Sequence, residues 1–103
     1  MADFYIKRND TSPVINAALA IDGSIADLTG ATVRFHMGSI VDAEAEIISE
    51  QDGTVRYSWI AADTVTAGRY PAEFEVTFVD GRIETFPNTY NDELIIIIPE
   101  DLA

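Results

Sequence analysis

The chain has 103 residues and no cysteine, and its 18 acidic and 6 basic residues give a formal net charge of −12. This length suits one hydrophobic core, so we interpret residues 1–103 as a single domain. The missing thiols exclude disulfides and thiolate metal sites, and the negative charge disfavours binding to nucleic acid.

The sequence begins at Met1 without a basic segment followed by an apolar one, so no secretory signal is expected. Its longest apolar run, Leu94–Ile98, is far shorter than a membrane span. We therefore expect a soluble protein that is made in a cytoplasm. The acidity is interpreted chiefly as an aid to solubility, with complementarity to a basic partner as the alternative.

Turn residues and alternating apolar residues predict eight strands, which is typical of an antiparallel β-sandwich. The predicted strands cover residues 3–8, 14–21, 31–37, 43–48, 53–60, 69–79, 82–87 and 93–98. Turns are expected at residues 9–13, 22–24 and 51–53. Residues 61–66 are predicted to form one helical turn that crosses between sheets, and no longer helix is expected.

Three of these strands have clear inward faces, because side chains alternate along a strand. The residues expected to face the core are Val33, Phe35 and Met37; Val55, Tyr57 and Trp59; and Tyr70, Ala72, Phe74, Val76 and Phe78. The Asp80-Gly81 pair predicts a two-residue type I′ hairpin. That register places Val79 opposite Arg82 and Phe78 opposite Ile83.

The segment from Thr66 to Ala72 resembles an immunoglobulin-type tyrosine corner, in which a Tyr hydroxyl bonds to backbone a few residues upstream. Ala72 stands where antibody domains carry their second Cys. We therefore interpret Tyr70 as a structural residue, and the predicted fold is an immunoglobulin-like antiparallel β-sandwich of about seven to eight strands.

Two segments suggest contact surfaces. Asp42–Glu46 alternates acidic residues with Ala and is predicted to be an edge strand or a loose loop. Leu94–Ile98 is apolar throughout, so both of its faces should be covered. The core would cover one face, and either another subunit or a loop of the same chain would cover the other.

The sequence contains no arrangement of residues that indicates a catalytic site. His36 is the only His, and it is predicted to be exposed and non-catalytic, so that its replacement leaves folding unchanged. No metal-binding or nucleophile motif is present, and Glu73, Glu75 and Glu84 are expected on a solvated face. We predict no catalytic, cofactor-binding or metal-binding residues and no cofactor. Three aromatics could form a sugar platform or pack at an edge: Tyr5, Phe86 and Tyr90.

Several segments, taken in order, resemble the N-terminal domain of the phage baseplate upper protein family. They are FYIKRNDT at 4–11, DLTGATVRF at 27–35, Gly53 with Val55, Tyr57 and Trp59, AGRY and AEFEV within 67–76, and DGR with ETFP within 80–87. The resemblance covers nearly the whole chain. It implies an immunoglobulin-like domain in a phage or prophage baseplate that docks onto other virion proteins and has no enzyme activity.

Family members that anchor receptor-binding proteins continue beyond this domain, whereas this chain stops at Ala103. The leading prediction is a non-enzymatic tail or baseplate subunit of a tailed bacteriophage or prophage. The alternatives are a head or neck accessory or decoration protein, or a carbohydrate-binding host-adhesion module. We expect a location in the virion after synthesis in the host bacterial cytoplasm.

The expected partners are other phage virion proteins and further copies of the chain within the particle, and neither nucleic acid nor membrane. Because a charge of −12 opposes self-association, the free protein should be a monomer or weak oligomer at low salt. The contacts on the particle are expected at Leu94–Ile98 or Asp42–Glu46, through pairing of exposed strand groups.

Overall fold

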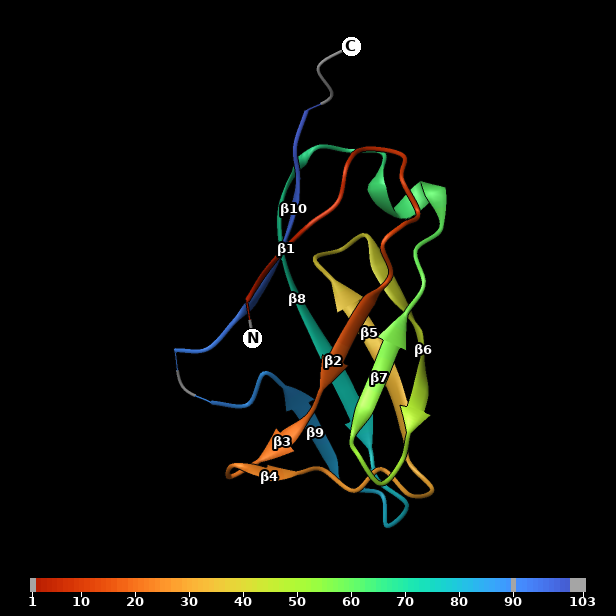
Figure 1. Ribbon diagram of the computed structural model, residues 1–103, viewed down its shortest axis with the longest axis vertical. Coiled ribbons are helices and arrows are strands. Elements are labelled where there is room, and N and C mark those ends of the chain that lie inside the picture. Colours follow the sequence, from red (N-terminus) through yellow and green to blue (C-terminus); the bar gives the residue numbers. More distant parts are fainter. Residues whose placement is uncertain (1, 90, 101–103) are drawn as a thin grey trace.

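The computed structural model describes residues 2–89 and 91–100. Its strands are β1 (Asp3–Tyr5), β2 (Ile15–Ala18), β3 (Ala20–Ile21), β4 (Ser24–Ile25), β5 (Thr32–Met37), β6 (Val41–Ser49), β7 (Thr54–Tyr57), β8 (Gly68–Thr77), β9 (Ile83–Phe86) and β10 (Leu94–Ile98). One short 3-10 helix, η1 (Ala61–Thr64), lies where a helical turn is predicted (Figure 1). Among the described residues, no helix is long and apolar enough to cross a membrane.

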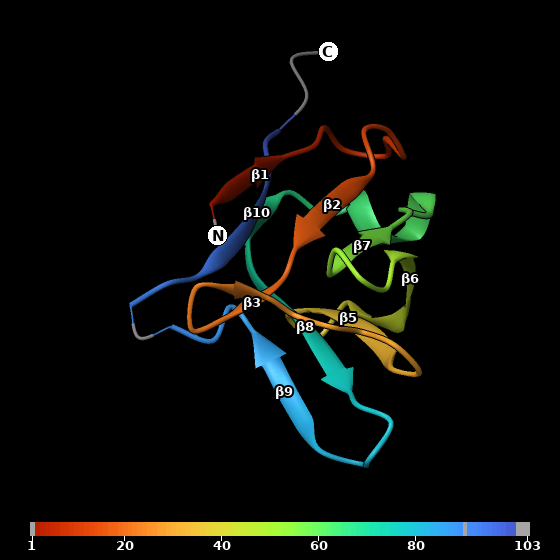
Figure 2. The same ribbon diagram turned by 60° about the horizontal axis from the view of Figure 1, so that its bottom comes forward.

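The strands follow one another around a common core. Their order is β1-β10-β8-β5-β6-β7-β2, with β9 also beside β8 and a separate β3–β4 hairpin. All pairings are antiparallel except that of β1 with β10. Figure 2 shows β10, β8 and β5 facing β2 and β7, with β6 joining the two layers. The all-β immunoglobulin-like sandwich is confirmed.

The faces predicted to be apolar do point into the core. Phe35 and Phe74, from one layer, are fully buried. Tyr57 and Trp59, from the other layer, are nearly as buried. The Phe35 ring stacks on Tyr57 with centroids 4.7 Å apart, and Trp59 meets it edge-on at 5.6 Å. Such aromatic contacts add to the burial of apolar area, so this cluster joins the layers without a disulfide.

β6 is a regular strand that serves both layers. Val41 to Ala45 pair with β5, whereas Glu46, Ile47 and Ser49 pair with β7. Its charged residues face outward, and two of them have cross-strand partners: Asp42 contacts Arg34, and Glu46 contacts Arg56. Among the described residues, each half of β6 pairs along one edge only, so Asp42–Ala45 does form the edge of its layer, as the first of the two alternatives predicts; the alternative of a loose loop is wrong.

β10 is paired along both of its edges, to β1 on one side and to β8 on the other. Leu94, Ile96 and Ile98 are buried, while Ile95 and Ile97 are half-buried on the outer face. Both ladders use the backbone groups of the strand. β10 therefore cannot recruit another chain by strand pairing, and that predicted contact is wrong.

The hairpin between β8 and β9 differs by one residue from the predicted register. Thr77 pairs with Ile83, and the Phe78 N–H donates to the Arg82 carbonyl at 2.8 Å. The loop thus has three residues, and of these only Gly81 has a positive φ, 90°. A type I turn followed by a left-handed glycine produces this geometry, so the predicted type I′ turn is wrong.

The tyrosine corner is present at the start of β8. The Tyr70 hydroxyl donates to the carbonyl of Thr66 at 2.8 Å and lies 3.3 Å from that of Ala67. The ring lies over Gly68, where an added Cβ would come within 3.0 Å of the hydroxyl oxygen. This contact fixes the path by which the chain leaves η1 and enters β8.

We expect Tyr70→Phe to lower the free energy of unfolding by about 1–3 kcal/mol, because it leaves backbone carbonyls of the corner without their donor. Tyr5→Phe is the matched control, since that ring is 63% exposed. Thermal melts of the three proteins provide the measurement. Equal midpoints for all three would show that the corner hydrogen bond contributes nothing.

Candidate functional site

The outer face of the larger layer carries a network of charged residues. Arg34 on β5 donates from Nε to the Oδ1 of Asp42 at 2.8 Å and from Nη2 to its backbone carbonyl at 3.0 Å. This hydrogen bond, with smaller contributions from the nearby charges of Arg34 and His36, lowers the pKa of Asp42. Both side chains are solvent-accessible, so the pair contributes little to stability.

His36 lies inside this network and is half-buried. Its Nδ1 is 3.5 Å from the Asp42 carboxylate on β6, and its Nε2 is 3.8 Å from that of Glu75 on β8. The prediction of an exposed His36 is wrong, because carboxylates on both neighbouring strands enclose the ring. No group of three or more His, Cys, Asp or Glu in the described part of the chain is arranged to hold a metal ion.

We expect His36→Gln to lower the free energy of unfolding by about 0.5–1 kcal/mol, because the ring packs between two carboxylates. Sequence alone predicts a negligible change for an exposed residue. Urea titrations of the two proteins distinguish these results. A midpoint identical to that of the unsubstituted protein would mean that the contacts with Asp42 and Glu75 have no net value.

A buried polar group lies inside the molecule, apart from the charged network on the outer face, and it is not evident from the sequence. Asp63 in η1 is only 6% exposed, and its Oδ2 accepts from the Tyr57 hydroxyl at 2.6 Å and from the Ile60 N–H at 3.0 Å. Burial, followed by the hydrogen bond and charge of Asp63, raises the pKa of Tyr57. The carboxylate is engaged by two donors, so we assign it a structural role.

The three candidate sugar-binding aromatics do not form a platform. Phe86 is buried on β9, where it pairs with Phe74, so its predicted surface position is wrong. Tyr5 is exposed on β1. Tyr90 lies outside the described residues. A stacking surface made from these three rings is therefore excluded by the burial of Phe86.

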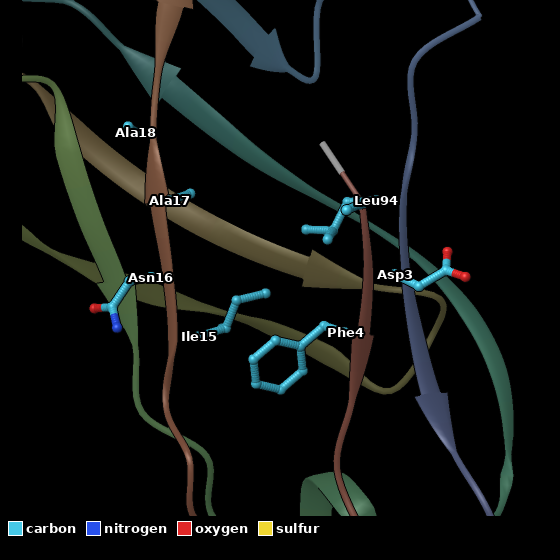
Figure 3. A pocket seen from close by; sticks show the side chains of 8 residues that line it. Asp3, Phe4, Ile15, Asn16, Ala17, Ala18 and Leu94 are labelled. Carbon is cyan, nitrogen blue, oxygen red and sulfur yellow. The ribbon is translucent and has the colours of Figure 1, made fainter.

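An apolar cleft of about 290 Å³ opens between β1 and β2 (Figure 3). It is lined by Ala2, Asp3, Phe4, Ile15, Asn16, Ala17, Ala18 and Leu94. Figure 3 shows the side chains of Phe4, Ile15 and Leu94 directed into the space between the two strands. None of the described lining residues is Lys or Arg, and Asp3 is the one charged residue among them.

The cleft lies where the strand order ends. Among the described residues, β1 pairs with β10 alone and β2 pairs with β7 alone. Each strand thus turns an unpaired edge toward the cleft, and unpaired edges are sites at which strands add. Sequence analysis missed this site because Phe4, Ile15 and Leu94 are distant in the chain and read individually as core residues.

The strand order, the inward aromatic cluster and the tyrosine corner define an immunoglobulin-like β-sandwich. The family model for the BppU N-terminal domain matches residues 2–91, so the chain belongs to this family, the N-terminal domains of phage baseplate upper proteins. The predicted resemblance is confirmed. Membership identifies the chain as a structural protein of the phage tail or baseplate, and thus of the virion.

Solved structures show the same fold. The N-terminal domain of phage TP901-1 ORF48 has a TM-score of 0.63 and 16% sequence identity, over 96% of this chain and 99% of that one. CopC from Methylosinus trichosporium OB3b has a TM-score of 0.56 and 10% identity, over 100% and 89%. No curated protein matches the sequence. At these identities the likeness shows the fold alone.

Proposed function

We propose that the chain is a non-enzymatic building block of a phage baseplate that docks onto other virion proteins. The family match over residues 2–91 carries this proposal. The proposal includes residues 1–103 as one domain, no catalytic, cofactor or metal site, several copies in each particle, and no binding to nucleic acid or membrane. Synthesis in the host bacterial cytoplasm belongs to the same proposal.

The surface supports docking rather than spontaneous self-assembly. A net charge of −12 makes free copies repel one another, and salt screens that repulsion over about 10 Å at 0.1 M. Both edges of β10 are already paired. The unpaired strand edges among the described residues include those of β1, β2, β9, the two halves of β6 and the β3–β4 hairpin.

The first test is the location of the chain in purified particles. Tails and heads are separated on a gradient, and the chain is quantified by mass spectrometry and located by immunogold labelling. We expect it in the tail fraction, at the tip, in a fixed ratio to the other baseplate proteins. Its recovery with tail-less heads, or its absence from washed particles, would overturn the proposal.

The second test addresses assembly of the free protein. We expect light scattering at low salt to give the mass of a monomer or weak oligomer, because the excess of carboxylates opposes association. Ordered multimers should appear when a baseplate partner is added. A tight oligomer of the protein alone that persists across the salt series would contradict partner-dependent assembly.

A further inference from the structure

The backbone hydrogen bonds of β1 identify which of its groups face the cleft. The Ala2 carbonyl accepts from Ile95 on β10, and the Ile6 N–H donates to Ile97 on the same strand. Because backbone groups alternate in direction along a strand, the even-numbered residues of β1 bond to β10. The N–H and C=O groups of Asp3 and Tyr5 therefore point away from β10, toward the cleft.

The same reasoning applies to β2 on the opposite wall. The Leu19 N–H donates to the Gly53 carbonyl at 2.8 Å and continues the ladder between β2 and β7. The odd-numbered residues thus bond to β7, while the N–H and C=O groups of Asn16 and Ala18 point toward the cleft. Two rows of unpaired donors and acceptors thus face the same apolar floor.

The shape of the cleft fits an extended chain. Ile15 and Leu94 form a buried floor, and three alanines leave room above it. A volume of about 290 Å³ is near the lower end of the roughly 300–1,000 Å³ of small-molecule sites, so it admits a few side chains and not a folded element. An added strand offers apolar side chains on one face and backbone groups on both edges.

Charge argues against a second copy of this chain as the occupant. Each copy carries −12, and the charged residue at the rim of the cleft is itself an acid, Asp3, whose carboxylate Figure 3 shows directed away from the space between the strands. A segment flanked by Lys or Arg would complement both the cleft and the whole molecule. Asn16 offers no counter-charge, and its Oδ1 already accepts from the Nε of Arg56.

We propose that the cleft between β1 and β2 receives an extended segment of another baseplate protein, with alternating small apolar residues and basic flanks. This inference rests on the proposed docking function and names its surface. Following the pairings from β1 to β2, the two strands run in opposite directions. The added strand is therefore parallel to one wall and antiparallel to the other.

The test uses overlapping synthetic peptides that cover the tail and baseplate proteins of the phage or prophage that encodes this chain. Each peptide is titrated into the ¹⁵N-labelled full chain, and amide shifts and hydrogen exchange are recorded. We expect at least one peptide with basic flanks to bind and to protect the amides of Asp3, Tyr5, Asn16 and Ala18. A titration with unlabelled chain and one with a glycan panel test the other possible occupants.

Substitutions at two positions challenge the assignment. Ala18→Pro removes an N–H that points into the cleft without altering the ladder to β7, and Ala18→Ser is the control that retains it. We expect Ala18→Pro to weaken peptide binding about tenfold and Ala18→Ser to leave it unchanged. Asp3→Lys, on an exposed residue, should also weaken binding of basic-flanked peptides, with Asp3→Asn intermediate.

The outcomes separate this inference from the proposed function. Any of three results would overturn it. These are equal peptide affinities of the Ala18→Pro and Ala18→Ser variants, the failure of every peptide to shift or protect the four amides, and the same amide shifts produced by unlabelled chain or by a glycan. The proposed function stands if the chain is nevertheless found in the tail fraction of particles. Absence from particles overturns the proposed function whatever the peptides do.

Discussion

Gly53→Ala is expected to lower the free energy of unfolding by about 2–5 kcal/mol. Gly53 follows β6 with a φ of 67°, in the left-handed region, which costs an L-residue about 1–2 kcal/mol. A Cβ there would lie 2.7 Å from the carbonyl oxygen of Ala26 and 2.9 Å from that of Leu19. Both are backbone atoms and cannot rotate away, so overpacking adds about 1–3 kcal/mol.

Gly23→Ala is the matched control for this substitution. Its φ is 80°, but no atom lies within 4 Å of the added Cβ, so only the conformational cost of about 1–2 kcal/mol remains. Urea titrations of both variants measure the difference. Equal destabilisation would show that the carbonyls of Leu19 and Ala26 shift to accommodate the new methyl group.

Two of the three Asp-Gly pairs of the chain show what local sequence can and cannot specify. The pair at 22–23 closes a two-residue loop between Ile21 and Ser24, with φ values of 51° and 80°, as a type I′ turn requires. At 80–81 the Asp80 carboxylate instead accepts from the Arg82 N–H at 3.1 Å and its Nε at 2.7 Å. The dipeptide predicts a turn correctly, while neighbouring contacts decide its register.

Burial explains why the sheet faces could be predicted. A period-two pattern of apolar residues has one inward solution, so Phe35 and Phe74 had to face the core. His36 shows the limit, because its exposure depends on Asp42 and Glu75, which reach it from other strands. The pairing of β10 on both edges is likewise a long-range property that its own apolar residues do not encode.

The cleft between β1 and β2 could not be found from sequence for the same reason. Its floor joins Ile15 on β2 to Leu94 on β10, and its walls exist only because the strand order ends at β1 and β2. Each residue on its own satisfies the pattern of an ordinary core position. A site built from unpaired backbone edges leaves no signature in side-chain chemistry.

The second large effect is expected for Asp63→Ala, which should lower the free energy of unfolding by about 2–4 kcal/mol. The substitution leaves the buried Tyr57 hydroxyl and the Ile60 N–H without their acceptor, at about 1–3 kcal/mol for each unpaired group. Asp63→Asn keeps an acceptor oxygen and should cost less. Urea titrations give both values.

A double-mutant cycle with Tyr57→Phe isolates the contact between the two side chains. Once Asp63 is replaced by Ala, removal of the Tyr57 hydroxyl should cost less than it does in the unsubstituted protein, because the hydroxyl has already lost its partner. Additive effects would show that Asp63 acts only through the Ile60 N–H and through its place in η1.

The pH dependence of stability provides an independent check on the same pair. In the unfolded chain a tyrosine loses its proton near pH 10, whereas burial and Asp63 raise the pKa of Tyr57 in the folded protein. A raised folded pKa contributes stability that is present below about pH 10 and is lost as the pH rises beyond it. Tyr57→Phe should therefore flatten the alkaline fall in unfolding free energy, and an unchanged slope would mean that the hydroxyl ionises as readily in the folded protein as in the unfolded chain.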